Sequence, residues 1–308
     1  MDIFSKITLK EKVLFILLFL GALFNSKAQQ EPLLAAFHTQ MNLVNPAFAG
    51  HKAGTEIGIT SRNQWVSIEN APRGQFLTFS SERKNNIGLG ISVISNKFFV
   101  EKSTSFAVDF SYKLNLANDA KILLGIKAGS DFYNLDTGNL TNFSDDPGID
   151  NFSSFKPNLG IGIAYFSENL WMSASLPRLF SDREDDSYLF LPSSNINLYL
   201  ALGGKLNISD DINLKSNFIY KSNQIDNVGI LNALVGVKGL DFGGMYKTSN
   251  DFGLLAFFKL KNFNIGYCYE VPNSIQSTNL GVKTHEITLR MSIGSGGQPS
   301  EVEEAVEE

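Results

Sequence analysis

Residues 103–114, with the sequence STSFAVDFSYKL, alternate strictly between two kinds of side chain. Phe106 and Val108 fall on one face, whereas Ala107 and Asp109 fall on the other. Because successive side chains of a β-strand point to opposite faces, this period of two predicts a strand. The bulky apolar face suits contact with lipid, and the small, polar face suits a narrow barrel lumen.

The composition limits the class of protein. The chain has 308 residues, of which 43% are hydrophobic and 19% are charged, with a net charge of −5 and a pI of about 5.4. The hydrophobic content is too high and the net charge too low for a disordered chain, and the acidic pI argues against a nucleic-acid binder. Beyond residue 28 no run of about 18 apolar residues predicts a membrane helix. The single cysteine excludes a disulfide scaffold, whereas the 25 Phe and 26 Gly favour a lipid-facing β protein.

The same alternation recurs from about residue 54 to residue 293 and predicts an all-β fold, a transmembrane antiparallel β-barrel. Aromatic residues near the strand ends fit the girdles of such barrels, and a soluble all-β fold is the alternative. We count about 14 strands, which we expect at residues 54–62, 74–82, 86–95, 103–114, 121–133, 157–166, 169–176, 194–206, 211–220, 226–237, 240–248, 252–260, 263–270 and 284–293.

The connections between these strands alternate in length. Ser167–Glu168, Lys238–Gly239 and Lys261–Asn262 are short, whereas Asn134–Lys156 and Pro177–Ser193 are long. Bacterial outer-membrane barrels have short periplasmic turns and long outer loops. We therefore expect both termini on the periplasmic side.

The two ends of the chain carry separate signals. A basic start, a short apolar run and the small residues Ser26 and Ala28 are typical of a secretory signal peptide over residues 1–28. We expect an N-terminal periplasmic segment at residues 29–52, the outer-membrane β-barrel at residues 53–293 and an acidic flexible tail at residues 294–308. Whether the lumen is open or plugged stays open at this point.

Residues that carry chemistry are scarce. His38, His51 and His285 have no second His or acid at metal-ligand spacing, so we expect no metal site. Cys268 lacks a cysteine-enzyme signature and is interpreted as a buried small residue. We expect no catalytic residue and no cofactor. The acidic loop at residues 144–150 could offer oxygens to Ca²⁺, but it lacks the spacing of an EF-hand, so a solvated loop is favoured.

Charged residues of both signs fall on the small-residue face of the expected strands. They either pair across a filled lumen or line a water channel. A strongly selective pore would show charges of one sign, so the mixed charges argue against a selective porin without excluding it. The residues are Asp109, Lys113, Lys127, Asp131, Lys215, Lys247, Lys259 and Arg290.

Short elements near the two ends of the barrel resemble a known family. NPAFAG at residues 45–50 is followed by RNQW at residues 62–65 and APR at residues 71–73, and THEITLRM at residues 284–291 ends the strand pattern. Together they resemble the PorP/SprF family of type IX secretion system outer-membrane proteins of Bacteroidetes. Phe48 stands where the family usually has Tyr, and the tail extends beyond the last strand, where many members stop.

The resemblance implies a barrel that works with the type IX secretion machinery. Some members are needed for the secretion apparatus itself, and others serve the export or surface attachment of a large surface protein, gliding adhesins among them. The implied partners are this exported cargo, secretion components and outer-membrane lipid, with no nucleic acid and no enzymatic activity. A passive channel or small-molecule transporter is the alternative function.

The same motif residues have physical roles. Asn45-Pro46 favours a turn, and Gly50 permits a positive φ. The guanidinium of Arg62 would not stay unpaired inside a barrel, and Trp65 suits the outer interface. We favour structural support for this set, with direct partner binding as the alternative. The set comprises Asn45, Pro46, Gly50, Arg62, Asn63, Gln64, Trp65 and Pro72.

Overall fold

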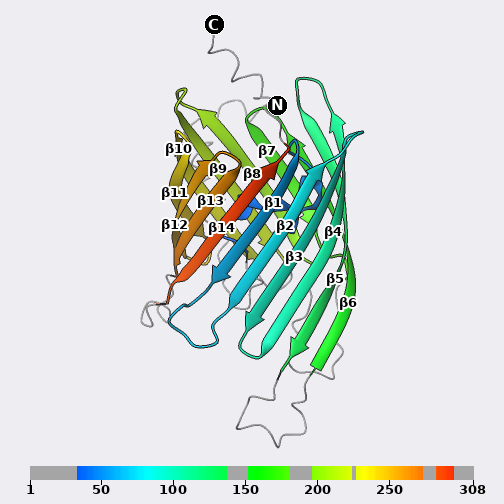
Figure 1. Ribbon diagram of the computed structural model, residues 1–308, viewed down its shortest axis with the longest axis vertical. Helices are drawn as coiled ribbons and strands as arrows, with labels where there is room; N and C mark the ends of the chain where they lie inside the picture. The colour runs from blue at the N-terminus through cyan, green and yellow to red at the C-terminus, as the bar shows by residue number, and fades with distance from the viewer. Residues whose placement is uncertain (1–32, 137–151, 181–195, 224–226, 273–281, 295–308) are drawn as a thin grey trace, which may run out of the picture.

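The chain forms one closed antiparallel barrel of 14 strands, in which β1 pairs with β14 and every other strand pairs with its neighbours in sequence (Figure 1). The structure, a computed structural model, describes residues 33–136, 152–180, 196–223, 227–272 and 282–294. The predicted fold class and strand number are confirmed. The strands are β1 (Thr55–Asn63), β2 (Arg73–Glu82), β3 (Ile87–Phe98), β4 (Glu101–Asn115), β5 (Lys121–Leu135), β6 (Phe152–Phe166), β7 (Leu170–Leu176), β8 (Leu198–Asn207), β9 (Ile212–Ser222), β10 (Asn227–Val237), β11 (Leu240–Lys247), β12 (Phe252–Leu260), β13 (Phe263–Val271) and β14 (Thr284–Ile293).

The outer face of the barrel carries the bulky apolar side chains that the alternation predicted. Ile126, Phe155 and Leu254 are each more than half exposed there, at 59%, 61% and 68%. In water this surface would be unfavourable at about 25 cal/mol per Å². The exposed apolar wall therefore fits a lipid surround. No helix among the described residues has the length and apolar character needed to cross a membrane.

The two ends of the barrel differ in their connections. We call the end that holds turns such as Lys238–Gly239 the short-turn end, which is uppermost in Figure 1, and the opposite end the long-loop end. Strands extend further at the long-loop end than predicted: β6 begins at Phe152 rather than at residue 157, and β3 ends at Phe98 rather than at residue 95. The extra residues are partly polar, so the apolar alternation stops before the backbone pairing does.

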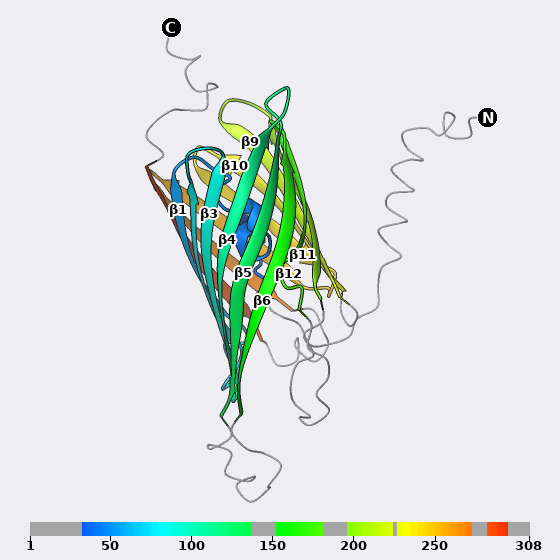
Figure 2. The ribbon, with the colours of Figure 1, turned by 90° about the vertical axis from the view of Figure 1, so that its right-hand side faces the viewer.

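Residues 33–52 lie inside the barrel, where Figure 2 shows them in blue behind the strands. We call them the lumen segment. It contains three single turns of 3₁₀-helix, η2 (Phe37–Thr39), η3 (Met41–Leu43) and η4 (Pro46–Phe48). From the sequence we expected a periplasmic segment at residues 29–52, and the structure places its described part in the lumen. The predicted signal peptide, tail and acidic loop lie outside the described residues, apart from Gly294.

The lumen segment runs from the long-loop end to the short-turn end. Near its start, the amides of Ala35 and Ala36 contact Glu286, the third residue of β14, which follows a long connection. Near its end, Gly50 contacts Ser80, close to the turn between β2 and β3. The segment then reverses into β1, so it is antiparallel to that strand.

The barrel interior holds a hydrophobic core on the side of β8 to β13. Phe37, Met41 and Phe48 of the lumen segment belong to one buried cluster with Ile219 of β9 and Leu234 of β10. These side chains are at most 4% exposed. Burying one such side chain contributes about 1.5–3 kcal/mol, so this part of the lumen is a packed core. Here the expected wall of small, polar residues is replaced by apolar ones.

Candidate functional site

Glycines on the lumen wall of the short-turn half allow the lumen segment to approach the strands. A Cβ added to Gly88 of β3 would lie 2.7 Å from the carbonyl carbon of Ala49, and one added to Gly125 of β5 would lie 2.7 Å from Cα of Ala47. Any side chain at these positions would overlap the backbone of residues 46–49. The glycine-rich face that the sequence suggested for a narrow lumen therefore seats a peptide backbone.

Asn45 joins the lumen segment to two strands at once. Its side-chain amide donates to the carbonyl oxygens of Ile163 (3.2 Å) and Ala174 (3.3 Å). Its Oδ1 accepts a hydrogen bond of 2.9 Å from the amide of Ala47, which caps η4. A Cβ on Gly162 would come 2.9 Å from Cγ of Asn45. This buried asparagine, 1% exposed, thus has specific partners on β6 and β7.

Pro46 and Gly50 shape the backbone on either side of η4. Pro46 is buried at the first position of η4, where its fixed φ is compatible with the turn. Gly50 has a φ of +61°, and its amide donates to Oγ of Ser80 at 2.7 Å. A Cβ on Gly50 would lie 2.6 Å from Cα of Gly88. The positive φ expected for Gly50 is confirmed, and the turn at Gly50 lies against β2 and β3 of the barrel wall.

An aromatic cluster lies in the short-turn half. The ring of Phe48 packs edge-on against Phe166 at 5.3 Å and Trp171 at 5.5 Å between ring centroids. The ring of His51 stacks on Phe166 at 5.7 Å, and its Nδ1 is 2.7 Å from the carbonyl oxygen of Phe48. Burial, with a smaller contribution from Lys52, lowers the pKa of His51 to about 4. His51 is therefore neutral at pH 7, which suits its aromatic surroundings.

Four charged side chains form a buried group in the long-loop half, which we call the lumen ion network. Arg62 of β1 contacts Glu270 of β13 at 2.8 Å and Glu286 of β14 at 3.0 Å, and Lys247 of β11 also contacts Glu270. Their side chains are at most 7% exposed. Two cations and two anions balance, as burial in a low dielectric requires. The expected pairing of Arg62 is confirmed.

The lumen ion network holds the start of the lumen segment. The carboxylate of Glu286 accepts one hydrogen bond of 2.9 Å from each of the amides of Ala35 and Ala36. Further along, Gln40 accepts from Oγ1 of Thr60 at 2.7 Å and donates to Oγ1 of Thr78 at 3.0 Å. Charge-assisted and buried hydrogen bonds of this kind define one position for the segment.

Most of the other predicted lumen charges also have partners. Lys127 lies 2.7 Å from Asp109, and Lys215 lies 2.7 Å from Asp241. Further ion pairs join Arg178 to Asp131 (3.3 Å), Arg290 to Glu56 (3.8 Å) and Lys113 to Glu82. Of the two alternatives left by the sequence, these contacts agree with pairing of the charges inside a filled lumen.

The remaining motif residues form part of a rim loop, residues 63–72, at the long-loop end. The amide of Gln64 donates to the carbonyl oxygen of Pro72 at 3.0 Å, and Asn63 ends β1. Trp65, with a φ of +48°, lies edge-on to Phe98 at 6.5 Å and is 36% exposed. The eight motif residues are thus divided: Asn45, Pro46, Gly50 and Arg62 lie in the lumen, and Asn63, Gln64, Trp65 and Pro72 lie at the rim.

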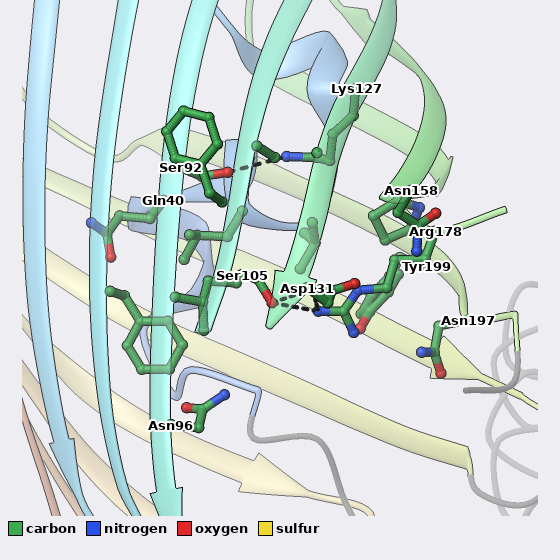
Figure 3. A pocket seen from close by; sticks show the side chains of 18 of the residues that line it. Gln40, Ser92, Asn96, Ser105, Lys127, Asp131, Asn158, Arg178, Asn197 and Tyr199 are labelled. Carbon is green, nitrogen blue, oxygen red and sulfur yellow. Dashed lines mark hydrogen bonds and ion pairs between the residues drawn. The ribbon is translucent and has the colours of Figure 1, made fainter. Parts of the chain in front are cut away.

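A cavity of about 90 Å³ lies beside the start of the lumen segment, in the long-loop half (Figure 3). Apolar side chains of Leu34, Phe37 and Phe76 border it, together with Ala107. Amide and charged side chains surround it, as Figure 3 shows: Gln40, Asn96, Lys127, Asp131, Asn158, Arg178 and Asn197. No feature of the sequence pointed to this cavity, because alternation shows which side chains face the lumen but not which strands oppose each other across it.

The described residues hold no group of three or more His, Cys, Asp and Glu side chains arranged to bind a metal ion. Cys268, on the lumen face of β13, is 3% exposed and unpaired, in agreement with its interpretation as a buried small residue.

Among solved structures the chain is similar to membrane barrels. The CymD monoaromatic hydrocarbon channel aligns with 82% of this chain and 92% of its own, at 10% identity and a TM-score of 0.50. A mutant of the TodX monoaromatic hydrocarbon channel covers 80% and 91% at 10% identity, with a TM-score of 0.43. The NanC porin covers 77% and 100% at 8% identity, also with a TM-score of 0.43. At such identities these likenesses concern the fold alone.

Similarity in sequence is more specific than these likenesses in fold. No curated protein matches the chain. Residues 26–291, however, match the family described as type IX secretion system membrane protein PorP/SprF. The match includes the NPAFAG element in the lumen, the RNQW element that leads into the rim loop, and most of β14. The chain is therefore a member of the PorP/SprF family of type IX secretion system membrane proteins.

Proposed function

We propose that this protein is a non-enzymatic outer-membrane barrel that assists the export or surface attachment of a cell-surface protein by the type IX secretion system. Family membership supports the link to secretion, and the apolar outer wall supports a membrane location. By the general rule for bacterial barrels, the short-turn end faces the periplasm and the long-loop end faces the cell surface.

The observation that carries this proposal is the lumen segment. Its backbone lies against Gly88 and Gly125, its apolar side chains join the interior core, and its start is held by Glu286. A water-filled channel needs a continuous polar path, which this packing opposes in the short-turn half. A closed barrel with structured ends suits a protein that binds partners at those ends.

The two ends suit different partners. At the cell-surface end, the rim loop presents Trp65, Val66 and Ile68 with exposed fractions of 36%, 58% and 39%. Exposed apolar side chains at a loop favour contact with another surface, here an exported, adhesin-like protein such as a gliding adhesin. The described part of the chain presents short turns at the periplasmic end, and docking of this end to the periplasmic machinery is the second contact in this proposal.

A passive channel is the second candidate function. The fold of the CymD monoaromatic hydrocarbon channel and the cavity in the long-loop half favour it. The packed short-turn half opposes it. Purified protein in a planar lipid bilayer distinguishes the two, because a partner-binding barrel of this kind gives no current at any voltage, and a channel conducts.

The test of the main proposal is deletion of the gene, followed by quantitative mass spectrometry of cell-surface, periplasmic and medium fractions. We expect at least one exported surface protein to leave the surface fraction and to accumulate in the periplasm or in the medium. Re-expression of the full chain should restore it. Normal export and surface display of every cargo in the deletion strain would overturn the proposal.

A further inference from the structure

We propose that the cavity in the long-loop half binds one large apolar side chain of an extended peptide segment belonging to the exported partner. This inference rests on the proposed function and names the site at which the partner would be held. The cavity is bordered by Leu34, Phe37 and Phe76 and lies between the lumen segment and the wall of β2 to β6 and β8.

The position of the cavity determines the side from which a ligand enters. On the short-turn side the lumen segment packs against Gly88, Gly125 and Gly162 with no room for a single added carbon atom. On the other side, Asn96, Asn158 and Arg178 lie toward the long-loop ends of β3, β6 and β7. A ligand therefore reaches the cavity from the long-loop end, where an exported protein would be present.

The size of the cavity favours a side chain over a free small molecule. Pockets for small molecules usually enclose about 300–1,000 Å³. This cavity measures about 90 Å³, which is less than the volume of about 150 Å³ of an engineered protein cavity that binds benzene. Space of this order suits one leucine or methionine side chain. Its apolar border, in which Leu34, Phe37 and Phe76 are themselves at most 4% exposed, suits the same group.

The polar surroundings favour an uncharged peptide. The two cations at the cavity already have partners: Arg178 contacts Asp131 at 3.3 Å, and Lys127 contacts Asp109 at 2.7 Å. A charged ligand would have to break a pair of this kind. Four amide side chains also line the cavity, namely Gln40, Asn96, Asn158 and Asn197. Gln40, Asn158 and Asn197 have hydrogen-bond partners within the protein. Oδ1 of Asn96 is buried without a hydrogen-bond partner among the described residues, and it matches the amide donor of a peptide backbone.

The test introduces a large side chain into the cavity from a residue of the barrel wall. Ala107 on β4 borders the cavity, and its neighbour Val108 points to the lipid side with 44% exposure. Ala107→Trp would occupy the space, whereas Val108→Trp adds the same side chain outside and is the matched control. The probe is the set of exported proteins whose surface amount falls when the gene is deleted. We expect Ala107→Trp to reduce their surface retention about tenfold or more, as loss of one buried apolar side chain implies, and Val108→Trp to keep the wild-type level.

Failure of this inference is distinguishable from failure of the proposed function. If deletion itself leaves export unchanged, the proposed function is wrong. If deletion removes a surface protein and the folded Ala107→Trp variant retains it as wild type does, only the cavity proposal is wrong. Heat-dependent migration on gels shows whether each variant is a folded barrel.

A second variant covers the case in which Ala107→Trp does not fold. Ala107→Cys adds little volume, and the native Cys268 is buried, so background labelling is low. Intact cells are treated with a membrane-impermeant maleimide that carries one aromatic ring. We expect labelling of the introduced thiol followed by loss of the exported protein from the surface. Labelling without that loss, or protection of the thiol by benzene but not by the exported partner, would overturn the proposal.

Discussion

The same strands form the walls of both halves of the lumen, and yet the two halves differ in how closely the lumen segment packs against the wall. In the short-turn half, glycines such as Gly88 and Gly125 allow the backbone of the lumen segment to touch the wall. In the long-loop half, a buried ion network holds the start of the segment, and a cavity of about 90 Å³ remains. The short-turn half is packed more closely, since the pocket beside Glu56 and Arg290 there measures about 20 Å³ against about 90 Å³ in the long-loop half. This difference supports the proposed entry of a ligand from the long-loop end.

The largest expected effect concerns the lumen ion network. Arg62→Met leaves Glu270 and Glu286 buried with only Lys247 nearby, which should lower the free energy of unfolding by about 3–5 kcal/mol or prevent assembly. Lys238→Met is the control, because the Lys238–Asp211 pair at 3.2 Å is exposed, and it should cost less than about 1 kcal/mol. Urea unfolding in detergent measures both. Equal effects would show that the network does not hold the long-loop half.

The next effect concerns the glycine wall. Gly125→Val would overlap the backbone of Pro46 and Ala47, and such overpacking should cost about 3 kcal/mol or more. We expect the lumen segment to leave its place and the barrel to conduct ions in a planar bilayer. Gly244→Val, where the nearest atom is 3.9 Å away, should stay closed. A closed Gly125→Val barrel would contradict the view that glycines seat the segment.

A smaller effect should follow from Asn45→Ala. The change removes the donors to Ile163 and Ala174 and the acceptor for the amide of Ala47, which should weaken docking of the lumen segment by about 1–3 kcal/mol. Hydrogen exchange of the amides in residues 45–50 should become faster. Asn262→Ala, in an exposed turn, is the control and should leave those amides protected. Unchanged hydrogen exchange in Asn45→Ala would mean that the backbone contacts with the glycines, and not the hydrogen bonds of Asn45, hold the lumen segment.

The smallest expected effect is a pH dependence of the short-turn half. The pKa of His51 is lowered from its ordinary 6.5 to about 4 in the docked segment, so its stabilisation is complete above pH 6.5 and is lost as the pH falls toward 4. At pH 5.5 docking should be weaker by about 1 kcal/mol. Fluorescence of Trp171, recorded in a Trp65→Phe background, reports the contact with Phe48.

The His51→Phe variant is the control for this pH effect, since it keeps the aromatic stack on Phe166 and cannot be protonated. It should show a smaller change in Trp171 fluorescence between pH 7 and pH 5.5 than the wild type. Any remainder is expected from His38, whose pKa burial lowers to about 3. An identical pH response in His51→Phe would exclude His51 as the titrating group.

Much of the barrel could be predicted because strand geometry is local. The alternation around Phe106 and Val108 indicated which face meets lipid, and the short connections indicated the hairpins. The same reading failed at Phe152–Lys156 and at Asn96–Phe98, because strand pairing there continues outside the apolar band. It also gave no sign of the interior core, since β10 and β12 carry apolar residues on both faces.

The candidate site was predictable only in part. The NPAFAG element pointed to residues that matter, and the need of Arg62 for buried partners was clear from its five donors. Its partners Glu270 and Glu286 lie 208 and 224 residues away, and no local pattern connects them to Arg62. The cavity could not be predicted for the same reason, because it joins residues that are far apart in the sequence. Leu34 comes from the lumen segment, whereas Ala107 and Asn158 come from β4 and β6.

By itself, the sequence determined the β class, the 14 strands, the lipid-facing side and the membership suggested by its motifs, because period-two alternation and short turns act between neighbouring residues. Only the tertiary structure decided that residues 33–52 fill the lumen, which glycines seat them and where space remains. Closure of the barrel brings β1 against β14 and encloses the preceding segment. Contacts across that enclosed space depend on volume and distance in three dimensions, which a one-dimensional pattern does not contain.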